Sequence, residues 1–155
     1  YDLDPSRNNF LTTLHDPCNY VRQMGIVKPQ RDILNAVMPK GNFHEMEPHG
    51  VNNYCCGGGS GFAIMNSMNF SYFRNNVSAR KKLSQILNAF GEASADPSII
   101  KYITAPCSNC KGTMRDLLEA WHMADYNFYY GGLVELVVNA MTKFDEPFLE
   151  FLRDE

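Results

Sequence analysis

The sequence lacks the features that mark several large classes of protein. It has no run of eighteen apolar residues, and its best apolar candidate, residues 131–141, is short and includes Glu135. We therefore expect no direct membrane span. Basic residues are also not in excess, since 14 Lys and Arg stand against 17 Asp and Glu, for a net charge of −3. Because neither sign is clustered, the balance argues against nucleic acid or an anionic membrane as a partner.

No internal repeat, low-complexity tract or clear linker interrupts the chain. Its 155 residues fit one domain of ordinary size. Apolar residues make up 45% and charged residues 20%, as in typical globular proteins, which argues against a disordered or fibrous chain. We predict a single domain over residues 1–155. Because Tyr1 is not Met and no signal-peptide pattern follows, we expect the chain to be a piece of a longer protein.

Strand and helix patterns alternate along the chain. Strands are predicted at residues 10–14, 42–46, 99–105 and 126–129. Helices are predicted at residues 30–38, 77–90, 109–123 and 133–141, with weaker periodicity at 148–152. This alternation predicts an α/β fold, with a small, mostly parallel sheet flanked by helices. Ligands bind such sheets beyond the carboxyl ends of the strands. The loops that carry Cys18 and Cys107, each just after a strand, should therefore face one crevice.

The five cysteines fall into three groups. Cys18 stands alone, Cys55 and Cys56 are adjacent, and Cys107 and Cys110 form a CxxC motif. An odd number argues against a closed disulfide framework, because one thiol would be left over. Closely spaced cysteines without such a framework are typical of metal binding or catalysis.

Three kinds of cysteine chemistry are compatible with this spacing. Mononuclear zinc suits the CxxC but not an adjacent pair, whose side chains bind one small ion only with strain. A cluster of several iron atoms better explains both the count and the pairing, although ordinary cubanes take four cysteines and no ferredoxin spacing is present. A dithiol redox site at Cys107, near a helix N-terminus, would leave the other cysteines unexplained.

A glycine-rich run follows the adjacent cysteines, from Gly57 to Gly61. It lacks the Lys-Ser/Thr of a phosphate-binding loop. We expect Gly57 and Gly58 to allow the backbone to approach a bulky inorganic ligand, with amides free to bond sulfur. A plain flexible loop is the alternative.

The four histidines carry weaker signals. His15, three residues before Cys18, is expected to make a structural hydrogen bond in the loop, and a place beside a metal site is the alternative. His44, His49 and His122 are expected in loops or on the surface. None is predicted to be a ligand.

Three motifs together resemble one known family. They are HDPC at residues 15–18, CCGGGSG at 55–61 and PCSNC at 106–110. The combination resembles the cysteine-rich CCG domain of heterodisulfide reductase B and D subunits, over residues 10–138. The stretches HDPCNYVR and YCCGGGSGF are most similar to the C-terminal domain of DsrK-type iron–sulfur subunits, found in the membrane complex linked to dissimilatory sulfite reduction.

The resemblance implies a cofactor and a reaction. It implies a noncubane [4Fe–4S] cluster on five ligands: Cys18, Cys55, Cys56, Cys107 and Cys110. Such a domain would be an oxidoreductase acting on sulfur groups, reducing a disulfide one electron at a time. For DsrK-like proteins the implied substrate is the trisulfide of a small sulfur-carrier protein, DsrC.

The resemblance also implies partners and a location. Other subunits of a membrane-associated redox complex would supply electrons from a quinol pool through a ferredoxin-like domain, and the chain would lie at the cytoplasmic face of the membrane. The gap between CCG and CxxC is longer than usual in heterodisulfide reductases. The extra residues, expected within 65–82, are hypothesised to form part of a protein-docking surface.

Two other functions remain open at this point. Some relatives of the family serve flavin-dependent lactate or glycolate oxidases, in which the domain only relays electrons. A non-catalytic zinc module on Cys107, Cys110 and two other cysteines is the second alternative.

Overall fold

A computed structural model describes residues 2–59 and 71–153 of the chain. Its centre is a sheet of four parallel strands in the order β2-β1-β3-β4. The strands are β1 (Leu11–Leu14), β2 (Phe43–His44), β3 (Lys101–Thr104) and β4 (Phe128–Gly131). The predicted α/β class with a small parallel sheet is thus confirmed.

Helices connect and flank the strands. The α-helices are α1 (Lys28–Val37), α3 (Ser71–Phe73), α4 (Arg80–Phe90), α5 (Ser108–Ala120) and α6 (Leu133–Ala140). The shorter 3-10 and π turns are η1 (Pro5–Asn8), η2 (Asn19–Gln23), η3 (Gly50–Asn52), η5 (Arg74–Ser78), η6 (Gly91–Ala95), η7 (Met123–Tyr126) and η8 (Glu150–Leu152).

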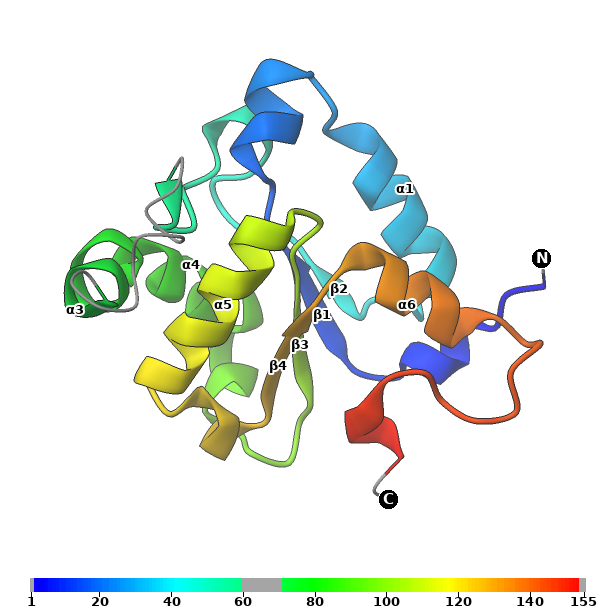
Figure 1. Cartoon of the computed structure of the whole chain (residues 1–155). Helices are drawn as coiled ribbons and strands as arrows, with labels where there is room; N and C mark the ends of the chain where they lie inside the picture. Colours follow the sequence, from blue (N-terminus) through cyan, green and yellow to red (C-terminus); the bar gives the residue numbers. More distant parts are fainter. Residues whose placement is uncertain (1, 60–70, 154–155) are drawn as a thin grey trace.

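The sheet is covered on both faces. Helices α4 and α5 pack on one face, and α1 and α6 pack on the other (Figure 1). Successive side chains of a strand point to opposite faces, so Ile103 joins the core under α4 and α5 while Tyr102 joins the core under α1 and α6. Because both faces are covered, even the polar strand residues Thr12, Thr13 and Lys101 are buried.

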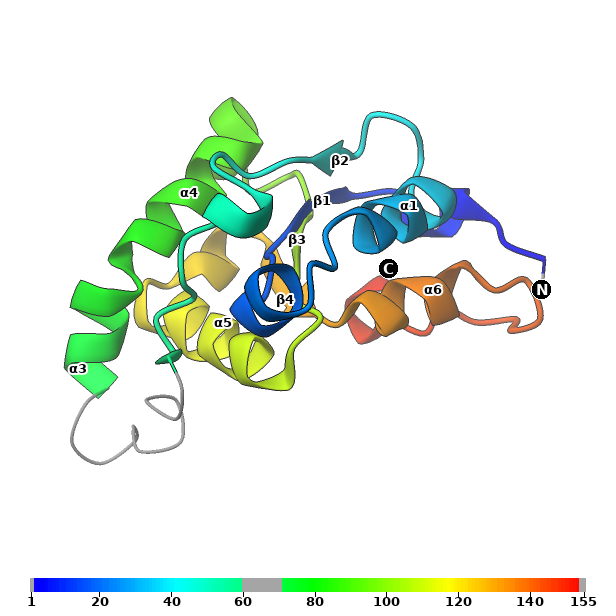
Figure 2. The same cartoon turned by 90° about the horizontal axis from the view of Figure 1, so that it is seen from above.

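The strand order creates a switch point between β1 and β3. From β1 the chain runs to β2 on one side, and from β3 it runs to β4 on the other, as the view onto the strand ends shows (Figure 2). The carboxyl ends of the two strands lie together, with Leu14 paired with Thr104. In open α/β sheets the crevice at such a point is the usual ligand site.

Most predicted limits are shifted by one to three residues, and for three elements the structure shows a local reason. Strand β2 has two residues instead of five, because the chain leaves the sheet edge after His44. Strand β4 begins at Phe128, because η7 and the left-handed Asn127 (φ 59°) occupy the predicted strand start. Helix α4 begins at Arg80, because the π turn η5 precedes it.

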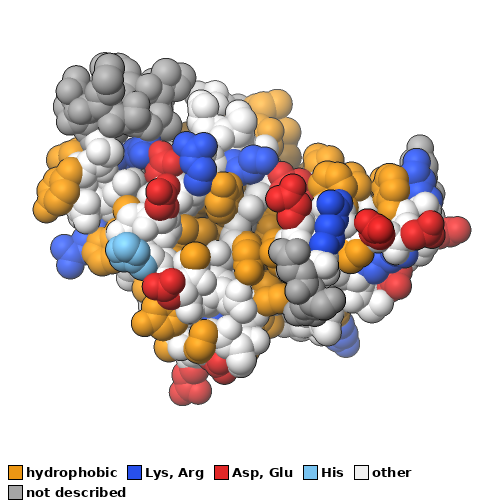
Figure 3. Space-filling view, turned by 60° about the horizontal axis from the view of Figure 1, so that its bottom comes forward, with side chains coloured by type: hydrophobic (Ala, Val, Ile, Leu, Met, Phe, Trp, Pro, Cys, Tyr) orange, Lys and Arg blue, Asp and Glu red, His pale blue; other side chains and the backbone are white. Residues whose placement is uncertain are grey.

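The end of the molecule opposite the switch point, at the amino ends of the strands, carries acidic and basic side chains interspersed with apolar ones (Figure 3). Within residues 2–59 and 71–153, every helix is too short or too polar to cross a bilayer. Ser60, Gly61 and the first part of the 65–82 segment lie outside the described residues.

Candidate metal centre

Strand β1 delivers Cys18 to the switch point. The strand ends at Leu14, and Cys18 then leads directly into the π turn η2. The carbonyl of Pro17 accepts hydrogen bonds from the amides of Tyr20 and Val21, at 2.9 and 3.0 Å. These bonds turn the chain sharply, and the Cys18 side chain stays exposed.

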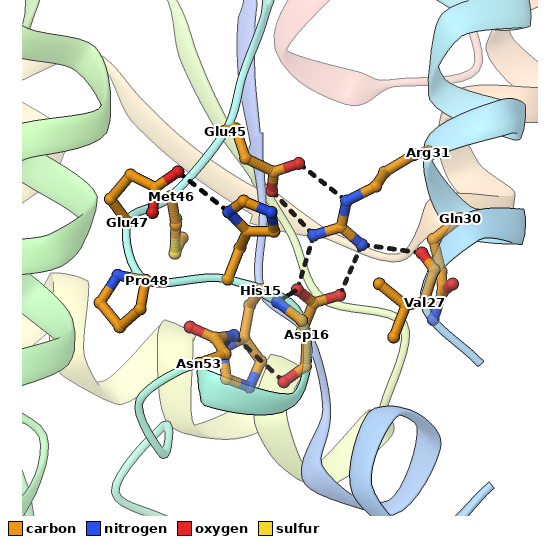
Figure 4. A network of polar contacts seen from close by, with 12 residues as sticks. His15, Asp16, Val27, Gln30, Arg31, Glu45, Met46, Glu47, Pro48 and Asn53 are labelled. Atoms are coloured by element: carbon orange, nitrogen blue, oxygen red, sulfur yellow. Dashed lines mark hydrogen bonds and ion pairs between the residues drawn. The ribbon is translucent and has the colours of Figure 1, made fainter. Parts of the chain in front are cut away.

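The loop before Cys18 is fixed by the buried carboxylate of Asp16. Both its oxygens accept from the Arg31 guanidinium, at 2.9 and 2.7 Å, and one also accepts from the Gly50 amide at 2.6 Å (Figure 4). Arg31 donates at the same time to both oxygens of Glu45, at 2.7 and 2.8 Å. One guanidinium therefore ties the Cys18 loop to α1 and to the segment after β2.

The adjacent cysteines lie in the loop that leads toward α4. The amide of Gly57 donates to the sulfur of Cys55 at 3.3 Å, and the amide of Gly58 donates to the sulfur of Cys56 at 3.4 Å. Amide donors of this kind stabilise thiolates, as expected for this run. Gly57 has φ +91°, and a Cβ there would lie 2.7 Å from the Cβ of Ala79. The loop therefore packs directly against the start of α4.

Strand β3 delivers the CxxC motif. The strand ends at Thr104, Cys107 is the N-cap of α5, and Cys110 lies in the first turn of that helix. Cys110 is buried and Cys107 is half-buried. Cys107 packs against the core cluster that contains Cys56 and Cys110.

These loops surround one small cavity. Its lining consists of His15, Asp16, Cys18, Val21, Arg22, Asn53, Tyr54, Cys55, Cys56 and Cys110. Four of the five cysteines thus meet there, while Cys107 packs beside it without lining it. Cys56 and Cys110 are buried at its inner side, whereas Cys18 and Cys55 are exposed.

The two adjacent thiols, Cys55 and Cys56, hold their protons tightly. A hydrogen bond with the Cys110 thiol, together with burial, raises the pKa of Cys56 to about 11. A hydrogen bond with Cys56 and then burial raise the pKa of Cys55 further. Because metals bind thiolates, loading this site must release protons.

His15 is closer to the thiols than the sequence indicated. A ring nitrogen of His15 and the sulfurs of Cys56 and Cys110 all lie within 4.8 Å of one another. The ring is fully buried, and its Nδ1 lies 3.5 Å from the Asn53 amide nitrogen. Burial, and then the charge of Lys82, hold the pKa of His15 well below 6.5, so the ring is neutral. It makes the expected structural contact and also faces the metal-binding groups.

Lys82 was not predicted to belong to the site. Its side chain is 0% exposed, and burial lowers its pKa to about 7, whereas a negative charge on Cys56 acts in the opposite direction. A signal was present in the sequence, because Lys82 shares the spacing of Ile86 and Phe90 on the apolar stripe of α4. A lysine on such a stripe is unusual and indicates a special environment.

The donor set fits a polynuclear iron–sulfur group. Soft thiolates select zinc, copper(I) or iron–sulfur clusters. The adjacent Cys55 and Cys56 line the same cavity, with backbone amides directed at their sulfurs, and the buried Lys82 side chain donates to Asn53, another residue of the cavity lining. Polar backbone around sulfur and a nearby positive charge both suit an anionic cluster.

Fold and site together define a parallel α/β domain with a thiol-lined cavity at its switch point. The profile of the CCG cysteine-rich domain family matches residues 12–115, and the chain belongs to this family. The matched range spans all five cysteines.

Two of the similar proteins come from Archaeoglobus species. The chain is 31% identical over 149 residues to the Hdr-like menaquinol oxidoreductase iron–sulfur subunit 2 of Archaeoglobus fulgidus, covering 93% of this chain and 24% of the relative. It is 30% identical over 144 residues to the Hdr-like menaquinol oxidoreductase iron–sulfur subunit of Archaeoglobus profundus, covering 91% and 23%.

A shorter match, 43% identical over 60 residues, is to one subunit of the fumarate reductase (CoM/CoB) of Methanothermobacter marburgensis, covering 39% of this chain and 12% of the relative. The chain thus spans about a quarter of the Archaeoglobus relatives it matches. No solved structure matches significantly.

Proposed function

We propose that this chain is the cluster-binding domain of a heterodisulfide-reductase-like oxidoreductase. The observation that carries the proposal is the convergence of cysteines from three distant segments on one cavity at the switch point. Membership of the CCG family and the names of the Archaeoglobus relatives support it.

The proposed cofactor is a noncubane [4Fe–4S] cluster. Its ligands would be Cys18, Cys55, Cys56, Cys107 and Cys110, one more than an ordinary cubane takes. Cys107 would complete the set from its half-buried position at the N-cap of α5. Gly57 and Gly58 would contribute backbone amides to the ligand sulfurs.

The proposed reaction is the reduction of a disulfide or trisulfide. When bound, the cluster would supply single electrons for cleavage of sulfur–sulfur bonds. Two electrons and two protons convert a disulfide to two thiols, and four electrons and four protons convert a trisulfide to two thiols and hydrogen sulfide. Cys18 and Cys55 are exposed and mark the side from which a sulfur substrate would approach. Cys56 and Cys110 hold the buried side, and the neutral His15 ring faces them.

The proposed substrate and partners follow from the likeness to DsrK-type subunits. The substrate would be the trisulfide of a small DsrC-like sulfur carrier in dissimilatory sulfur metabolism. The names of the Archaeoglobus relatives favour menaquinol as the electron source. We infer partner subunits of a membrane-associated redox complex, with this domain at its cytoplasmic face.

One observation favours a different function. The close approach of His15, Cys56 and Cys110 is also compatible with a single zinc ion in a structural module. Metal content separates the two functions directly.

The test is iron, acid-labile sulfide and zinc analysis of the complete protein purified without oxygen, with EPR of the oxidised form. We expect about four iron and four sulfide per site of this type. Addition of a trisulfide-bearing carrier should alter the EPR signal. About one zinc and no sulfide after anaerobic reconstitution would overturn the proposal in favour of the structural module. Co-purification with a flavoprotein instead of a sulfur carrier would favour electron relay.

A further inference from the structure

A buried lysine lies behind the cysteine cavity with only neutral partners. The Nζ of Lys82 donates to the side-chain oxygen of Asn53 at 2.8 Å and to that of Gln85, and it lies 3.7 Å from the sulfur of Met46. Gln85 is itself held by Pro48, whose carbonyl accepts from its amide at 2.5 Å. These contacts fix the Nζ of Lys82 in place and supply no negative charge to offset a proton on it.

The nearby carboxylate is already committed elsewhere. Asp16 is engaged by the guanidinium of Arg31 and the amide of Gly50. In the part of the chain that the structure describes, Lys82 makes no ion pair. A buried charge is retained only where something offsets its loss of hydration, so the surroundings of Lys82 are incomplete without an anion.

The cysteine cavity is where that anion would form. Asn53 lines the cavity and also accepts the hydrogen bond from Lys82. Its amide nitrogen donates to the Asp16 carbonyl at 3.2 Å and faces His15, as Figure 4 shows. One asparagine therefore separates the ammonium from the thiol-lined space. Thiolates bound to iron in that space carry negative charge in a medium where charges interact strongly.

We propose that Lys82 is a positioning residue that places a fixed positive charge behind the cluster and raises its reduction potential. This inference rests on the proposed function, because it requires a cluster on the cysteines. Reduction adds a negative charge to the cluster, and a nearby ammonium stabilises the reduced form more than the oxidised form. Lys82 acts through Asn53 and the electric field without itself being a ligand.

The alternative, a purely structural lysine, predicts different behaviour. A side chain kept for packing could be replaced by methionine of similar length with no change in redox properties. Lys82 shares a stripe with Ile86 and Phe90, where an apolar side chain would satisfy packing alone.

The test compares Lys82→Met with Lys81→Met in the complete protein, loaded anaerobically. Lys81 is the adjacent, exposed lysine, with its Nζ 4.5 Å from the centre of the Tyr54 ring. Potentiometric titration followed by EPR measures the cluster potential in each. We expect Lys82→Met to lower the equilibrium constant for one-electron reduction about tenfold, a shift of about 59 mV to lower potential. Lys81→Met should leave the potential close to wild type, because water screens its charge.

Two further variants keep the test decisive if Lys82→Met fails to load. Lys82→Gln keeps hydrogen-bonding capacity without charge, and Lys82→Arg keeps the charge. If only Lys82→Arg binds the cluster, or only Lys82→Arg has a near-normal potential, the result would support the proposed role of the positive charge. An unchanged potential in Lys82→Met or Lys82→Gln, or equal failure of all three folded variants, would overturn it. Absence of iron and sulfide from the wild-type protein would instead overturn the proposed function.

Discussion

A single glycine sets the shape of the loop that carries the adjacent cysteines. Gly57 combines φ +91° with an approach to Ala79 so close that an added Cβ would meet backbone and side-chain atoms at 2.7–2.9 Å. The third letter of the CCG motif is therefore explained by backbone conformation and packing. Any larger residue must displace either the loop or the start of α4.

Gly57→Ala should destabilise the metal-free protein by about 3 kcal/mol. This figure combines the cost of a left-handed conformation with that of a steric overlap. Gly59→Ala is the matched control, because its added Cβ meets nothing within 4 Å. Urea unfolding followed by circular dichroism measures both, and equal stability of the two variants would contradict the packing argument.

Cys56→Ser should abolish cluster assembly, because it removes a ligand at the buried side of the cavity. Cys18→Ser tests the exposed side and should also reduce the iron content from about four per site. Ser108→Ala, which alters a residue inside the CxxC that is not a proposed ligand, should load normally. Iron and sulfide analysis reads out all three, and a full cluster in Cys18→Ser would exclude the proposed five-ligand set.

At the scale of elements, much of the arrangement was predictable because it depends on local patterns. The β-branched and aromatic residues of β1 and β3 and the apolar stripe of α5 specify strands and a helix. Parallel strands then bring the loops after β1 and β3 to one edge. The limits of β2 and β4 were not predictable, since a left-handed Asn127 and the network around Glu45 decide them. The burial of His15 and Lys82 beside the cavity was also not predicted, because it depends on tertiary packing.

The ion pair between Arg31 of α1 and Asp16 of the Cys18 loop predicts that one substitution will strongly reduce stability. Arg31→Leu leaves the buried carboxylate of Asp16 without its guanidinium partner and should destabilise the protein by about 3–5 kcal/mol. Lys28→Leu on the same helix removes an exposed pair with Asp32 and should change stability by less than about 0.5 kcal/mol. Chemical denaturation of both variants checks the difference. Similar losses would mean that the helix, and not the ion pair, is responsible.

At the scale of the whole molecule, buried titratable groups make the stability of the metal-free protein depend on pH. The folded-state pKa of Lys82 is about 7, against an ordinary value of 10.5, so the unfolded chain binds one more proton between these values. The contribution of Lys82 to stability should therefore rise with pH from 7 to 9, by about 2 kcal/mol. From about pH 8 upward the raised thiol pKa values of Cys55 and Cys56 act in the opposite direction, because the folded chain keeps those protons.

Urea unfolding at pH 7, 8 and 9 under reducing conditions measures this rise. It should be absent in Lys82→Met and retained in Lys81→Met. A rise of the same size in all three proteins would show that another group is responsible.

The pairing of β1 with β3 also determines when the metal can enter. Leu14 and Thr104 are neighbours in the sheet although 90 residues separate them in the chain, the same separation that the Thr12–Tyr102 hydrogen bond bridges. Closing so long a loop is costly and slow, and the cysteine loops meet only after it is closed. Small zinc domains fold around their ion, whereas here we expect folding to come first. Iron and sulfide would then enter the already folded domain from the side on which Cys18 and Cys55 are exposed. Cluster insertion would therefore be a separate step that follows folding.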